Sequence, residues 1–164
     1  FTALLGLVAL GVTSTDGMIR RMGRNWNRLH MLAYPLAALG VLHFFMQSKA
    51  DVTQATLMAG FLIALLLYRF AHARGFALSS PWTPLAIAVL AALGTALAEY
   101  AWFALATRIP PMRVLLANLS FAYSIRPMWW VLAAALLALL ALALVAAKNA
   151  LLVKTAAAVL QKEP

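Results

Sequence analysis

The sequence predicts an all-α protein, a polytopic transmembrane helical bundle. Hydrophobic residues fill 65% of the 164 positions and charged residues only 10%, whereas soluble domains are about half apolar and about a quarter charged. The mean hydropathy is +0.91. Long stretches such as 84–97 and 128–147 contain no charged residue. These three observations indicate a chain that is embedded in a lipid bilayer.

Five segments approach the length of about 20 apolar residues that a membrane-spanning helix needs. The first is 1–15, which is short because we expect the chain to begin at Phe1 inside a cut helix. The others follow at about 29–47, 52–71, 84–106 and 128–147.

The charged residues predict how these helices are oriented. The segment 14–28 contains four arginines and is therefore expected in the cytoplasm, whereas the loop 48–54 has only Lys49 and Asp51 and is expected outside. Arg69 and Arg74 return the chain to the cytoplasm.

Two later segments are expected at the membrane surface. The stretch 107–127 violates the charge rule with three arginines, and its mixture of prolines and large apolar residues, Phe121 and Tyr123 included, predicts an interfacial segment. The tail with Lys148, Lys154 and Lys162 predicts a basic amphipathic helix on the cytoplasmic leaflet.

The composition changes near residue 80. Before it, aromatic, Met, His and polar residues are mixed into the helices, and after it the helices are mostly Ala and Leu. We therefore expect a cofactor-bearing part, 1–79, and an accessory membrane extension, 80–164. The 13 basic residues against 4 acidic ones lie at helix ends, which argues against nucleic-acid binding. With no cysteine in the sequence, thiolate metal sites and iron–sulfur clusters are excluded.

Two of the three histidines, His30 and His43, fall in the same predicted helix. Ionisable residues inside a span are costly and usually functional, and a neutral imidazole is a common axial ligand of haem iron. Thirteen residues separate the pair by about 20 Å and about 140° on an ideal helix. Pro35 lies between them, so a kink or local unwinding is expected. His72, beside Arg69 and Arg74 at a helix end, is not expected to bind a metal.

The stretch around these histidines contains an ordered set of further residues. The set comprises Thr13-Ser14-Thr15, Arg20-Arg21, Gly23, Trp26, Leu29-His30, Tyr34, His43-Phe44 and Lys49-Ala50-Asp51. With this set, about residues 1–75 resemble the YedZ/MsrQ family, the haem-binding membrane subunit of the periplasmic methionine sulfoxide reductase system, within the ferric-reductase-like transmembrane group.

The resemblance implies that 1–79 is the C-terminal part of a ferric-reductase-like haem-binding domain. His30 and His43 match two haem-ligand histidines of the family, and a third is expected upstream of Phe1. It implies haem b and, without any residue to identify its site, FMN. It also implies electron transfer from quinol or a flavin reductase, across the bacterial inner (plasma) membrane, to a periplasmic molybdopterin-containing catalytic subunit. Such a chain carries electrons and has no catalytic residues of its own.

Other interpretations remain open at this stage. A ferric-reductase or oxidase core normally carries a flavin- and nicotinamide-binding domain after its last helix, and no dinucleotide fingerprint follows here. A transporter or a structural membrane subunit would leave the two histidines unexplained. Glu99, towards the end of the fourth helix, is either a proton acceptor for quinol oxidation or, as we expect, paired with Arg108 or extended to the interface.

The orientation can be tested with reporters. A reporter fused near Asp51 should be active in the outer compartment, and one near Arg74 in the cytoplasm, because the arginines of 14–28 are retained inside. Paired alkaline phosphatase and green fluorescent protein fusions at both positions measure this. The reverse result at both positions would overturn the predicted orientation.

Overall fold

The computed structural model describes residues 1–48, 51–78, 80–121 and 124–160. Within them the side chains of 146 and 150–160 are not described, that of Lys154 among them, and Lys162, Lys49 and Tyr123 lie outside the described residues. The helices are α1 (Thr2–Val12), α2 (Asp16–Met22), α3 (Arg24–His30), α4 (Ala33–Gln47), α5 (Thr53–Ala73), α6 (Trp82–Ala106), α7 (Pro111–Ala117) and α8 (Pro127–Leu160).

The expected fold class is confirmed. Every regular element in the described part of the chain is a helix. Four helical stretches are long and apolar enough to cross a membrane, namely Arg24–Gln47, Thr53–Ala73, Trp82–Ala106 and Pro127–Asn149. The pair α1 and α2, bent by 94°, would make a fifth if it forms one broken span.

The segment 14–28, expected as a loop, is largely helical. The Thr15 side chain caps α2 by accepting a hydrogen bond of 3.4 Å from the Met18 N–H. Gly23, with a φ of 52°, then separates α2 from α3. A glycine adopts this left-handed backbone at little cost, so the chain turns between two short helices here.

The local unwinding expected near Pro35 is also present. Helix α3 ends at His30 and α4 begins at Ala33, with a turn at Met31 and Leu32. Pro35 has no N–H to donate to Met31, the residue four positions earlier, and its ring disfavours a regular helix there. The two predicted ligands are therefore on different helices.

The core of the bundle is a seam of small residues between α5, α6 and α8. Ala88 and Ala91 of α6 are buried, as are Ala55 and Ala59 of α5, which cluster with Phe45 of α4. Such residues let helix backbones approach closely in a membrane. At Gly60 the approach is tightest, because an added Cβ would lie 2.5 Å from Cγ2 of Val131 and would also meet the Thr95 hydroxyl.

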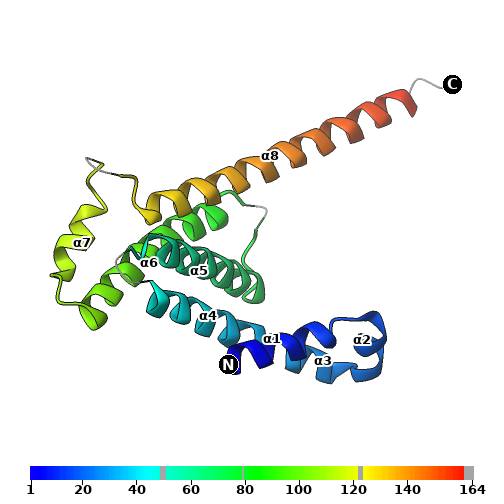
Figure 1. Ribbon diagram of the computed structural model, residues 1–164. Helices are drawn as coiled ribbons and strands as arrows, with labels where there is room; N and C mark the ends of the chain where they lie inside the picture. The colour runs from blue at the N-terminus through cyan, green and yellow to red at the C-terminus, as the bar shows by residue number, and fades with distance from the viewer. Residues whose placement is uncertain (49–50, 79, 122–123, 161–164) are drawn as a thin grey trace.

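Helix α4 packs along α5 and α1 along α4 (Figure 1). Phe45 is buried, and its ring centroid lies 5.0 Å from that of Trp102. On the other side of α4, Leu36 fills the space over Gly6 of α1. The predicted histidine-bearing helix is thus held between α1 and the α5–α6–α8 seam.

The chain between α6 and α8 lies at one end of the bundle. Figure 1 shows α7 running across the ends of the longer helices, and α8 leaving the bundle towards the other end. We call the end covered by α7 the α7 end. The opposite end, towards which α3 lies with His30 as its last residue, is called the His30 end. Helix α8 continues without interruption to Leu160, whereas the sequence predicted a span of 128–147 followed by a separate tail. The division at residues 79 and 80 stays a prediction.

Close packing at Gly60 predicts an unusual effect of alanine. Gly60→Ala should lower the stability by about 1–3 kcal/mol, the usual cost of overpacking, although alanine favours helix over glycine. Gly40→Ala is the matched control in α4, where an added Cβ meets nothing within 4 Å. The thermal unfolding midpoint in detergent measures both. Equal midpoints would show that α5, α6 and α8 pack less closely than described.

Candidate functional site

His30 is the last residue of α3, and its ring is held from two sides. It stacks on Trp26 with ring centroids 4.0 Å apart and planes inclined by 24°. Its Nε2 lies 3.2 Å from Oγ1 of Thr13, the residue that follows α1. Trp26 in turn donates from Nε1 to the Thr13 carbonyl oxygen at 2.8 Å. The imidazole is therefore oriented by contacts between α3 and the end of α1.

The Thr13 hydroxyl indicates which nitrogen of His30 is free. Oγ1 of Thr13 donates its one proton to backbone carbonyls of α1, at 2.7 Å to Ala9 and 3.2 Å to Leu10. With its proton used in this way, Oγ1 can accept from the Nε2–H of His30, the tautomer in which Nδ1 carries the free lone pair. A neutral imidazole binds metal through such a lone pair.

His43 has a different environment. It lies in α4 with its side chain exposed, among exposed apolar neighbours such as Leu39, Leu42 and Met46. Within the ranges that the structure describes, no hydrogen bond or ion pair involves its ring. An ionisable group on the outer face of a span is costly in lipid, so this face of α4 requires a polar or metal partner.

The structure does not bring the two histidines together. His30 faces the end of α1, whereas His43 lies on an exposed surface of α4, beyond the turn at Met31 and Leu32. No cluster of three or more His, Cys, Asp or Glu side chains occurs in the described part of the chain. Any metal site would therefore use each imidazole separately, together with ligands from elsewhere.

His72 is exposed in the last turn of α5, at the His30 end. It lines an open groove of about 470 Å³ together with Tyr34, Leu65, Tyr68, Arg69 and Ala73. The Arg69 guanidinium lies over the Tyr34 ring, 5.2 Å from its centroid. That His72 is not a ligand stays a prediction. The contact between Arg69 and Tyr34 was missed by sequence reasoning, because it depends on how α4 packs on α5.

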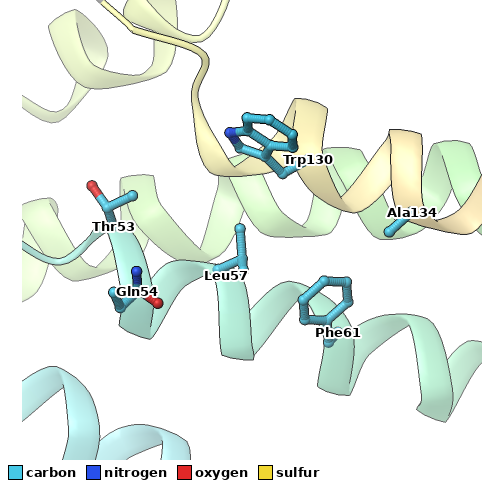
Figure 2. A pocket seen from close by; sticks show the side chains of 6 residues that line it. All are labelled: Thr53, Gln54, Leu57, Phe61, Trp130 and Ala134. Atoms are coloured by element: carbon cyan, nitrogen blue, oxygen red, sulfur yellow. The ribbon is translucent and has the colours of Figure 1, made fainter.

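A second groove, of about 320 Å³, lies between α5 and α8 near the α7 end (Figure 2). Its lining residues are Thr53, Gln54, Leu57, Phe61, Trp130 and Ala134. None of these side chains is a usual ligand of haem iron. The groove is therefore separate from the candidate histidine site.

Glu99 is paired, but its partner differs from the expected one. Its carboxylate is 2% exposed and accepts a bond of 2.6 Å from Nη2 of Arg126. It also accepts a bond of 3.2 Å from Nδ2 of Asn118. The expectation of pairing with Arg108 or of extension to the interface was wrong, because the segment after α6 folds back and brings Arg126 to the carboxylate.

Arg126 also acts on the loop between α4 and α5. Asp51 accepts hydrogen bonds from the Thr53 side chain and backbone N–H, the latter at 2.9 Å. These bonds, helped by the positive charge of Arg126, hold the pKa of Asp51 below its usual value.

These features define a polytopic α-helical membrane protein with two imidazoles on one broken span. A segment of the chain is homologous to curated proteins named protein-methionine-sulfoxide reductase heme-binding subunit MsrQ, which confirms the predicted resemblance over that segment. The protein of Xanthomonas campestris pv. campestris is 54% identical over 69 residues, 42% of this chain and 32% of that protein. The protein of Rhodospirillum rubrum is 51% identical over 72 residues, 43% of this chain and 35% of that protein.

The chain spans about a third of the length of these curated relatives. No family model and no solved structure matches it. The likeness therefore concerns one segment of each protein.

The buried ion pair gives a prediction of its own. Arg126→Gln should destabilise the protein by about 3 kcal/mol, because it leaves the Glu99 carboxylate buried without a counter-charge. Arg108→Gln is the matched control and should change stability little, since Arg108 is exposed. Thermal unfolding of both variants in detergent measures the difference. A larger loss of stability for Arg108→Gln than for Arg126→Gln would instead identify Arg108 as the partner of Glu99.

Proposed function

We propose that this chain is part of a membrane electron-transfer subunit that binds haem through His30 and His43. The observation that carries the proposal is the homologous segment, whose relatives are named heme-binding subunits. The two imidazoles within one membrane-spanning stretch, those of His30 and His43, add support. The multi-pass helical architecture agrees with a subunit of this kind.

The local chemistry of both imidazoles suits an axial ligand. His43 lies on an apolar face without a polar partner among the described residues. The lone pair of its neutral imidazole is therefore not engaged in a hydrogen bond there. His30 uses one nitrogen towards Thr13 and keeps the other, and its stacking on Trp26 fixes the ring plane. A second residue that orients a ligand histidine is a frequent feature of metal sites. When bound, haem supplies an iron centre that takes up and releases one electron at a time.

The finer parts of the proposal rest on the resemblance. We assign haem b as the cofactor, quinol or a flavin reductase as the electron donor, and a periplasmic molybdopterin-containing catalytic subunit as the acceptor. The location is the bacterial inner membrane. FMN is carried over by resemblance alone and is given no residue.

The two parts of the chain have separate roles in this proposal. Residues 1–79 carry the ligands, and 80–164 are an accessory membrane extension. Helices α6 and α8 pack on α5, the last helix of the first part. Because Trp102 of α6 meets Phe45 of α4, and α5 also packs on α4, the extension contacts the helix that contains His43 directly as well as through α5.

Histidine substitutions in the complete protein test the assignment. His43→Ala should remove at least one haem, because no water is present in the bilayer to replace the lost imidazole. His30→Ala should also reduce the haem content. Pyridine haemochrome assays, expressed per protein, and the visible spectrum of each purified variant measure this.

His72→Ala is the matched control, since His72 is exposed at a helix end, and its spectrum should be unchanged. Thr13→Val is a second variant, which removes only the hydroxyl that His30 contacts. It should shift the haem spectrum or potential without abolishing binding. Normal haem content in folded His30→Ala and His43→Ala would refute the assignment.

A further inference from the structure

The segment 107–121, between α6 and α8, lies across the α7 end of the bundle. We call these residues the end belt. Both helices that it joins are long and apolar enough to span a membrane, so both of its ends lie at the same membrane face. Figure 1 shows α7, the helical part of the belt, running across the ends of the long helices. The belt is therefore placed at the depth of the interface.

Polar contacts hold the belt in this position. Asn118, 2% exposed, directly follows α7 and donates to Glu99 of α6 at 3.2 Å. Its carbonyl oxygen accepts a bond of 2.7 Å from Nε1 of Trp129 in α8. The ion pair of Glu99 with Arg126 completes this cluster, which we call the Glu99 clamp. The belt is thereby fastened to α6 and to α8.

The fastened belt nevertheless presents a largely apolar surface. Its exposed large apolar side chains, with their exposed fractions, are Ile109 51%, Met112 54%, Leu116 58%, Leu119 69% and Phe121 60%. So many exposed large apolar side chains in one short segment are unusual in contact with water and indicate an interaction site. Only Val114 of the belt's large apolar residues is buried against the bundle.

The charges of the belt indicate what covers that surface. Its charged residues are Arg108 and Arg113, both exposed, and it contains no acidic residue. Exposed apolar side chains next to arginines suit the boundary between acyl chains and anionic headgroups. This also explains why three arginines occur in a segment that the charge rule would place outside: they pair with Glu99 or lie at the lipid surface.

We propose that the end belt is a membrane-surface anchor, whose exposed apolar side chains insert into the leaflet at the α7 end while Arg108 and Arg113 contact anionic phospholipid headgroups, and that the Glu99 clamp sets its depth. Glu99 is thus a positioning residue. The proposal depends on the membrane architecture alone, and not on haem binding.

Site-directed spin labelling tests this proposal directly. The 164 residues contain no cysteine, so one introduced cysteine can be labelled in the protein reconstituted in nanodiscs that contain phosphatidylglycerol. Leu116→Cys and Leu119→Cys should be accessible to oxygen and protected from the water-soluble nickel complex NiEDDA. Leu140→Cys, on the exposed face of α8, is the control in lipid, and Asp16→Cys, exposed at the start of α2, is the control in water.

Two further measurements test the lipid charge and the clamp. Replacing phosphatidylglycerol by phosphatidylcholine should raise the nickel accessibility of Leu119→Cys, because the arginines lose their phosphate-rich anionic surface. Adding Glu99→Gln should raise it severalfold, since the variant keeps the shape of the side chain and removes its charge.

Three outcomes would each contradict a different part of this proposal. Nickel accessibility at both leucine positions equal to that at Asp16→Cys would overturn the anchor and leave the surface to a soluble protein partner. Equal values in the two lipids would overturn the role of anionic headgroups. Unchanged accessibility after Glu99→Gln and also after Arg126→Gln would overturn the clamp.

Discussion

The close approach of α5, α6 and α8 at Gly60 is the constraint on which the remaining arrangement depends. Val131 and Thr95 occupy the space that a side chain at Gly60 would need, so α5 is fixed against both partners. Helix α4 then packs on α5, and its Phe45 ring meets Trp102 of α6. In a bilayer, hydrophobic burial gives little driving force between helices, and close packing of small residues takes its place.

The long helices could be predicted from sequence because the bilayer imposes a minimum apolar length. The span predicted at 52–71 is observed at Thr53–Ala73, and that at 84–106 is observed at Trp82–Ala106. Helices α2 and α3 could not be predicted from polarity, because a segment rich in arginines is also typical of a polar loop between spans. Their signals were local, namely the cap at Thr15 and the turn at Gly23. The partner of Glu99 depends on how 107–126 folds back, which no local pattern encodes.

The histidines show the same division between local and tertiary information. Their presence in one span and the break before Pro35 followed from the sequence, whereas the angle between them did not. Helical geometry cannot be carried through Met31 and Leu32, where the regular hydrogen bonding stops. The contacts of His30 with Thr13 and Trp26 require α1 and α3 to meet. All three residues belonged to the ordered set that suggested the family.

The length of α8 has a consequence for the opposite face of the membrane. Its 34 residues extend for roughly 51 Å at the usual rise per residue, whereas the hydrocarbon core is about 30 Å thick. A tilt that kept the whole helix inside would exceed about 50°, beyond the usual range of about 0–40°. The last turns of α8 therefore stand out of the lipid at the end of the helix away from α7. A soluble protein that docks on that face must fit around them.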